Sequence, residues 1–193
     1  MIEQVIDQTV RRVLQGEKVP ASEKIVSLFE PHTDIIVKGK REVQYGHKIT
    51  LCTGASALVL HVIVEQGNPA DSDCLIPIIE RHKKRYGDAP QDLAVDGGYT
   101  SQANLQQCQS MGVKNAAFHK QINLTVEQMT GGDKWLYNKL RRFRAGIEAS
   151  ISYLKRCFGL SRCNWKGWEH FKQYVHSGVF VHNLVQLAYL RPG

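Results

Sequence analysis

The sequence predicts an α/β domain in which an antiparallel part is joined to a parallel part. Three strand-like segments come first, strand-like and helix-like segments alternate in the middle, and a long helical pattern follows. With 193 residues, of which 42% are hydrophobic, the chain can bury one core. This order indicates helices that flank a mixed sheet, with one extra helix at the C-terminal end.

The first element expected is an amphipathic helix over residues 1–15, because apolar residues recur there at helical spacing. They are Ile2, Val5, Ile6, Val10, Val13 and Leu14. Gly16 and Pro20 then end the helix. We expect residues 1–20 to form an N-terminal helix and linker, and residues 21–193 to form the main domain.

Three strands are expected next. Residues 24–29 (KIVSLF) form a short apolar run, residues 43–53 alternate between apolar and polar, and residues 57–65 (ALVLHVIVE) are continuously apolar. Gly54 lies between the second run and the third, so we expect an antiparallel meander. His61, inside the third run, fits a histidine of the core or of the sheet face better than a ligand.

The stretch GNPADSD (67–73) is typical of a turn that leads into a helix, which we expect to reach about Tyr86. Asp71 or Ser72 would be its N-cap. Three shorter elements follow, namely a strand over 92–96, a helix over 101–111 and a strand over 113–118. A polar loop then leads to the long helical pattern.

A long amphipathic helix is expected over residues 136–158, with Asp133 as its cap. Its apolar residues recur in steps of three and four, at Leu136, Leu140, Phe143, Ile147, Ile151, Leu154 and Phe158. Residues 168–190 carry a second helical stripe, which is the extra C-terminal helix.

Glu148 lies at the edge of the apolar face of this helix. Arg144 precedes it by four residues and Lys155 follows it by seven, and all three project from nearly the same line. An ordinary solvated helix edge with weak ion pairs would explain the three charges. One carboxylate held between two cations would also suit a site that binds phosphate.

The positive charge of the chain is concentrated. The net charge is +7, and ten Lys or Arg residues lie between Lys134 and Lys172 against only two acidic residues. A patch of this kind suits a polyanion, most plausibly nucleic acid. Trp165 and Trp168 lie among the cations and permit base stacking, although buried indoles would explain them as well.

The five cysteines are scattered and odd in number, and no segment reads as a signal peptide or a membrane span. We therefore expect a cytoplasmic protein with no membrane partner. The spacing of Cys157, Cys163, His170 and His176 does not fit the usual zinc pairing.

The spacing Arg144, three residues, Glu148, six residues, Lys155 resembles the signature of bacterial insertion-sequence transposases of the DDE type. The surrounding RAGIEASISYLKRCFGLSRCNWKG is most similar to the ISNCY group, although Arg141 stands where that pattern often has Tyr. The resemblance covers residues 23–187. It implies a ribonuclease H-like fold, a catalytic domain over 21–193, and carboxylates that meet around metal.

Asp96 lies in VDGGYTS, which resembles the second acidic motif of these transposases. In the family the next position is commonly Arg or Lys, and here it is Gly97. An Asp at the end of a strand can also be a plain turn residue that bonds its own backbone. Gly98 is expected where a side chain would obstruct the turn.

The first acidic residue is less defined. SLFEPHTD resembles the family, and Glu30 lies closest to the expected strand end, with Asp34 further along. Glu30 is the choice here, while Asp34 or a residue outside this chain stays open. Glu30 could also simply flank a strand before Pro31, and Asp71 looks structural, at the start of its helix.

The resemblance implies that Glu30, Asp96 and Glu148 are the catalytic residues and bind Mg²⁺ or Mn²⁺. Two such ions can activate the attacking oxygen and stabilise the leaving one. Arg144 and Lys155 would contact DNA phosphates. Further DNA-binding residues would be Arg141, Arg142 and Arg156.

The function implied is DNA transposition by metal-dependent cleavage and strand transfer. Only a short segment precedes the catalytic part, so we expect a fragment that lacks an end-recognition domain, with that domain or a full-length transposase encoded elsewhere. A homodimer is possible. The alternative is an inactive remnant that binds DNA non-specifically through its basic helix, and an RNA-cutting enzyme is a weaker option.

Overall fold

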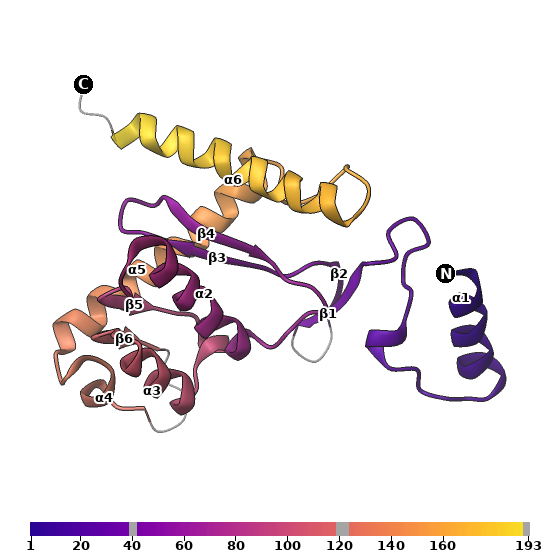
Figure 1. Cartoon of the computed structure of the whole chain (residues 1–193), viewed down its shortest axis with the longest axis horizontal. Coiled ribbons are helices and arrows are strands. Elements are labelled where there is room, and N and C mark those ends of the chain that lie inside the picture. The colour runs from indigo at the N-terminus through magenta and orange to yellow at the C-terminus, as the bar shows by residue number, and fades with distance from the viewer. Residues whose placement is uncertain (39–41, 119–123, 191–193) are drawn as a thin grey trace.

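The structure is a computed structural model that describes residues 1–38, 42–118 and 124–190. Helices and short strands alternate as expected for a mixed α/β fold, and the N-terminal helix lies at one end of the molecule, away from α2 to α6 (Figure 1). None of the helices in the described ranges is both long enough and apolar enough to span a membrane.

The predicted N-terminal helix is confirmed. Helix α1 (Ile2–Thr9) continues as a π-helical turn (Val10–Leu14). The side chain of Arg11 ties this helix to the segment after it, because it pairs with Asp7 at 3.4 Å, Glu17 at 2.9 Å and Glu23 at 2.8 Å. No residue of α1 itself is buried, so its apolar face remains open.

The predicted strand over 24–29 is wrong, because this segment forms no strand. The side chain of Gln8 bonds both backbone groups of Ile25, accepting from its N–H at 2.9 Å and donating to its carbonyl at 3.1 Å. These backbone groups are therefore satisfied by a side chain and not by a neighbouring strand. Phe29 is 83% exposed, so the apolar run is not buried either.

The predicted three-stranded meander is replaced by two antiparallel hairpins. Strand β1 (Asp34–Lys38), which was not predicted, pairs with β2 (Glu42–Gly46), and β3 (Ile49–Thr53) pairs with β4 (Val59–Val64). The expected strand over 43–53 is interrupted at His47 and Lys48. Their side chains bond Asp34 and Asp71, which takes the chain out of the ladder at this point.

The predicted alternation in the middle of the chain is confirmed. It consists of α2 (Asp71–Tyr86), β5 (Asp92–Ala94), α3 (Gln102–Ser110) and β6 (Asn115–Ala117). Strands β5 and β6 are parallel, as their connection through a helix requires. The N-cap of α2 was predicted wrongly, since it is Ala70 and Asp71 is the first helical residue.

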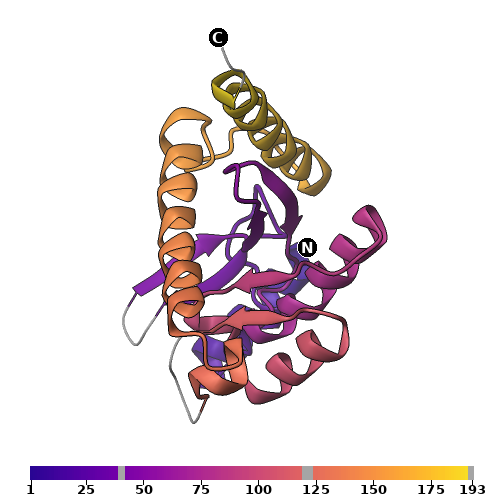
Figure 2. The same ribbon diagram turned by 90° about the vertical axis from the view of Figure 1, so that its left-hand side faces the viewer.

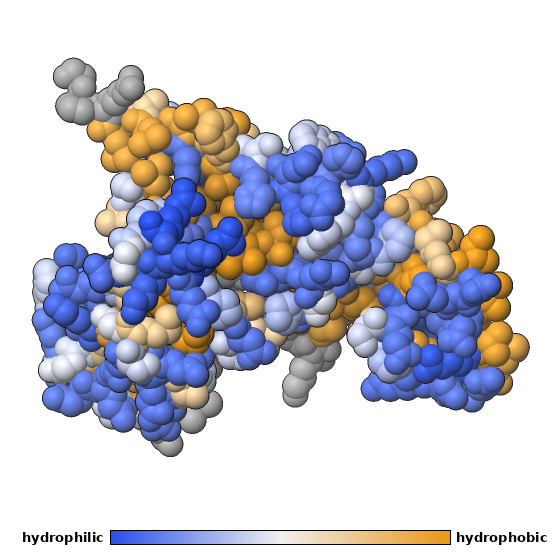
Figure 3. Space-filling view, viewed as in Figure 1, coloured by the Kyte–Doolittle hydropathy of each residue, from blue (hydrophilic) through white to orange (hydrophobic). Residues whose placement is uncertain are grey.

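Two long helices complete the fold. Helix α5 (Lys134–Cys157) is capped by Asp133 as predicted, and α6 (Trp168–Leu190) is the expected C-terminal helix. A short helix, α4 (Val126–Thr130), lies in the stretch expected to be a polar loop. Figure 2 shows α5 running along one side of the strands, and Figure 3 shows apolar surface over the C-terminal half of α6.

The described strands form three separate pairs, and no ladder joins these pairs into one sheet. Two clusters of buried residues support them. One lies among α2, α3, β5, β6 and the start of α5, and the other joins β4 to the end of α5 and to α6. In α5 the buried residues are Tyr137, Leu140 and Leu154, so the middle of this helix crosses between the two clusters without being buried.

Candidate active site

Asp96 lies at the end of the parallel pair, two residues after β5. Its Oδ1 accepts the N–H of Gly97 at 2.7 Å and so caps the short turn Gly97–Tyr99. Asp96 therefore does act as a turn residue that bonds the backbone next to it. The same oxygen also accepts a bond from Arg144 Nη1 at 2.8 Å, which a plain turn residue would not need.

Glu148 meets Asp96 through Arg144. Arg144 Nη1 lies 3.4 Å from Glu148 Oε1, one helical turn further along α5, and 2.8 Å from Asp96 Oδ1. Because both oxygens contact the same nitrogen, the distance between Asp96 Oδ1 and Glu148 Oε1 cannot exceed the sum of these two distances. Both carboxylate side chains are about 70% exposed, while Arg144 is 26% exposed. Two acidic residues from distant parts of the chain converge on the uncovered middle of α5.

Asp71 approaches the turn that carries Asp96. A side chain at Gly98 would overlap the carboxylate of Asp71, so the two elements can pack this closely only with Gly at this position. Asp71 also pairs with Lys48 at 2.9 Å. The sequence identified Gly98 as a position that a side chain would obstruct. It did not identify Lys48 as the partner of Asp71, because nothing in the residues around Lys48 indicates a contact with α2.

Glu30 has other partners in the structure. Both of its oxygens accept the N–H of Gly167, at 3.2 and 3.0 Å, and Oε2 lies 2.6 Å from His32 Nε2. The bond from Gly167 is the main reason why the pKa of Glu30 is lowered, with His32 acting in the same direction. The carboxylate therefore sits at the start of α6, where the free N–H groups of a helix favour a negative charge.

Asp34, the other candidate for the first acidic residue, is held by a second histidine. Its Oδ2 lies 2.9 Å from His47 Nδ1, and His47 Nε2 lies 2.8 Å from His32 Nδ1. Glu30, His32, His47 and Asp34 thus form one hydrogen-bonded chain, with the two imidazoles stacked at 4.9 Å. Burial lowers the pKa of His47, although Asp34 opposes this shift.

Both histidines were missed as partners of the acidic candidates. The only signal available was their position in PHTD and YGHK, close to Glu30 and after the hairpin. The pairing itself depends on the β1–β2 hairpin, which brings Asp34 opposite Gly46 and hence next to His47. Because β1 was not predicted, this chain of side chains was not predicted either.

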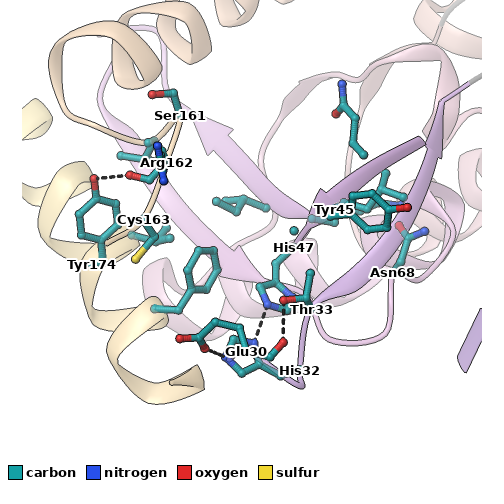
Figure 4. Close-up of a pocket in the computed structure, with 18 of the residues that line it drawn as sticks. Glu30, His32, Thr33, Tyr45, His47, Asn68, Ser161, Arg162, Cys163 and Tyr174 are labelled. Atoms are coloured by element: carbon teal, nitrogen blue, oxygen red, sulfur yellow. Dashed lines mark hydrogen bonds and ion pairs between the residues drawn. The ribbon is translucent and has the colours of Figure 1, made fainter. Parts of the chain in front are cut away.

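A groove of about 970 Å³ lies beside these residues. Figure 4 shows Glu30, His32 and His47 on one side and Arg162, Cys163 and Tyr174 on the other. Lys155, Arg162 and Lys166 supply positive charge from α5 and the loop after it, and Lys48 adds to it from the segment between β2 and β3. The predicted DNA contact Lys155 therefore lines a groove that a polyanion could enter.

The other predicted DNA contacts, Arg141, Arg142 and Arg156, are exposed on α5. Arg141 lies 5.8 Å from the centre of the Tyr137 ring, close enough for a cation–π contact. In the ranges that the structure describes, no three His, Cys, Asp or Glu side chains are grouped so that they could hold a metal. Glu30 is thus not gathered with Asp96 and Glu148.

A mixed α/β fold that brings two exposed carboxylates together beside a strongly basic helix has the features of a nucleic-acid-processing domain. The family model described as "Transposase DDE domain" matches residues 7–184. The chain belongs to this family, which confirms the resemblance at the level of the family and implies DNA transposition and a ribonuclease H-like fold. No curated protein and no solved structure matches the chain.

Proposed function

We propose that this domain cleaves phosphodiester bonds in DNA and transfers strands, as a member of the ISNCY-like group of transposases. Asp96 and Glu148 would hold the divalent metal, Mg²⁺ or Mn²⁺. The observation that carries the proposal is their convergence on one guanidinium nitrogen from the end of β5 and the middle of α5. A helix edge with only local ion pairs would not bring in Asp96 from outside the helix.

The two carboxylates fit a hard divalent cation. Mg²⁺ prefers oxygen ligands and keeps several of its waters, so it needs few protein ligands and an open site. Asp96 and Glu148 are both exposed, and Asp96 Oδ2 and Glu148 Oε2 make no hydrogen bond within the described ranges. When bound, the metal would supply charge relief at the phosphate and activation of the attacking oxygen.

The remaining residues would position the DNA. Arg144 and Lys155 are eleven residues apart on α5 and project along the edge of the helix that holds Glu148. Arg144 would grip a phosphate by its fork of N–H donors and Lys155 by its point charge. Arg141, Arg142 and Arg156 would contact the DNA backbone further along the same helix, and the groove that Lys155 lines would receive the strand.

Glu30 is proposed as the third carboxylate, which requires it to leave Gly167 and His32. Its competitor Asp34 would have to leave His47 in the same way. Conservative variants separate the two residues, since Glu30→Gln and Asp34→Asn keep the shape of the side chain and remove its charge. The variant that abolishes cleavage while the domain stays folded identifies the ligand, and full activity in both would place the third carboxylate elsewhere.

The central test is nicking of plasmid DNA with Mg²⁺ or Mn²⁺. We expect metal-dependent nicking that disappears in Asp96→Ala and in Glu148→Ala. Asp88→Ala is the matched control, because Asp88 is an exposed acidic residue that makes no ion pair in the described part of the chain. Cleavage that needs no metal, or that survives both substitutions, would refute the proposal.

A further inference from the structure

We infer that Arg144 is an exchangeable counter-ion, which holds Asp96 and Glu148 together before metal binds and moves to a DNA phosphate when the metal takes its place. This inference rests on the proposed function and deepens it. It assigns to Arg144 a positioning role in the metal-free domain, in addition to a contact with DNA. The observation that carries it is the shared use of one nitrogen, Nη1, by both carboxylates.

The geometry makes Arg144 the only cation that bridges the pair in the described residues. Asp96 and Glu148 come from different elements, and without a cation between them their like charges would repel. The side chain of Arg144 is 26% exposed, against about 70% for the side chains of its two partners, so Arg144 is the most covered of the three. Its two ion pairs hold the guanidinium close to both carboxylates.

The contacts are strong enough to organise the site and weak enough to exchange. Ion pairs between exposed groups contribute little to stability, because water and salt screen them. A divalent ion held by Asp96 and Glu148 would supply two positive charges where Arg144 supplies one. Only Nη1 of Arg144 is engaged with the carboxylates, and a guanidinium carries five N–H donors, so a released Arg144 can grip a phosphate with a full fork.

Two consequences follow for binding. A metal held by the two carboxylates would lie against the positive charge of Arg144 and compete with it for them, so removing this side chain should tighten metal binding. DNA that captures Arg144 frees the carboxylates, so DNA and metal should bind cooperatively, and each should raise the affinity for the other by the same factor. A residue that only contacts phosphate would not compete with metal in the absence of DNA.

The first test measures Mn²⁺ affinity from the free-ion signal in electron paramagnetic resonance, with no DNA and no turnover. We expect Arg144→Met to bind Mn²⁺ about two- to thirtyfold more tightly than the unmodified protein, the range set by loss of two exposed ion pairs. Lys139→Met is the control, since Lys139 is exposed on the same helix and the substitution removes the same charge while it leaves the bridge intact. Equal affinity in the two variants, or weaker binding in Arg144→Met, would overturn the inference.

The second test repeats the titration with a short DNA duplex present at saturation. The duplex should raise the Mn²⁺ affinity of the unmodified protein and of Lys139→Met by a larger factor than that of Arg144→Met, because the phosphate itself also attracts the metal. An equal rise in Arg144→Met and in Lys139→Met would contradict the exchange. If Asp96→Asn and Glu148→Gln bind Mn²⁺ as the unmodified protein does, the proposed metal site fails instead, so the two failures can be told apart.

Discussion

At the scale of single residues, the site is defined by side chains that have two roles. Asp96 caps its own turn and also reaches Arg144, and Glu30 caps α6 and also bonds His32. The sequence allowed Asp96 and Glu148 to be identified as candidates because each lies in a short motif with a defined spacing. The partners of Glu30 could not be identified, because Gly167 lies 137 residues away along the chain.

Gly98 offers a test of the packing behind Asp96. In Gly98→Ala the new methyl group would occupy the position of the Asp71 carboxylate, so Asp71 has to move and its ion pair with Lys48 is lost. We expect metal affinity and cleavage to fall, with a loss of about 1 kcal/mol in the free energy of unfolding measured in urea. Unchanged cleavage and Mn²⁺ affinity would show that this contact does not position Asp96.

At the scale of elements, the helices longer than eight residues and the short strands β5 and β6 were predicted, whereas the strands before α2 were predicted only in part. The helices α5 and α6 follow from apolar spacing, and α2 follows from the turn before it, and both are local signals. The apolar run over 24–29 gave the pattern of a buried strand, but no local signal reveals that the side chain of Gln8 takes the backbone of Ile25. Strand β1 was missed because it is defined by contacts with other segments, namely its pairing with β2 and the contact between Asp34 and His47. The residues of β1 alone carry no such signal.

The middle of α5 gives a prediction about the helix that carries the site. Gly146 lies between Arg144 and Glu148, and a methyl group added there would meet no atom within 4 Å. Gly146→Ala should therefore stabilise the domain by roughly 0.5–1 kcal/mol in urea unfolding, because Gly costs about that much in a helix. A destabilised variant would mean that this segment is not helical in solution.

The hydrogen-bonded chain between the β1–β2 hairpin and α6 predicts how stability depends on pH. The pKa of His47 is lowered in the folded protein, so the unfolded chain binds its proton more readily below the ordinary value of 6.5. Neutral His47 therefore contributes fully to the stability of the folded protein above pH 6.5. This contribution is lost as the pH falls from 6.5 through the lowered pKa that His47 has in the folded protein. The pKa of Glu30 is also lowered, and its contribution is lost below about 4.5 in the same sense.

We therefore expect the free energy of unfolding to decrease as the pH falls from 7.5 to 5.5 in urea titrations. His61, buried in β4 with its pKa lowered to about 4, acts in the same direction. His47→Gln and His61→Gln should each flatten this dependence, and the double variant should flatten it further. If the free energy of unfolding depended on pH in the same way in the unmodified protein and in His47→Gln, the hydrogen-bonded chain that contains His47 would not contribute to this dependence.

At the scale of the whole molecule, the two buried clusters explain why the site lies where it does. Helix α5 is anchored at one end by Tyr137 and Leu140 and at the other by Leu154, which leaves its middle open to Asp96 and to solvent. The basic excess of the sequence lies on this helix and on the loop after it. Glu148 and most of the basic residues therefore share one element, which the sequence supported because both signals lie within the same segment, while Asp96 reaches α5 from the turn after β5.

This arrangement predicts that DNA binding depends on one surface of the domain. Each phosphate contact lowers the logarithm of affinity by about 0.9 per logarithm of salt concentration, so Lys155→Ala should reduce the salt slope by about 1. Lys84→Ala, on α2, is the matched control because it removes an equal charge outside the basic segment. Fluorescence anisotropy with a labelled duplex at several salt concentrations measures the salt slope of each variant. Equal slopes in the two variants would mean that DNA responds to net charge alone and that the groove lined by Lys155 does not receive the strand.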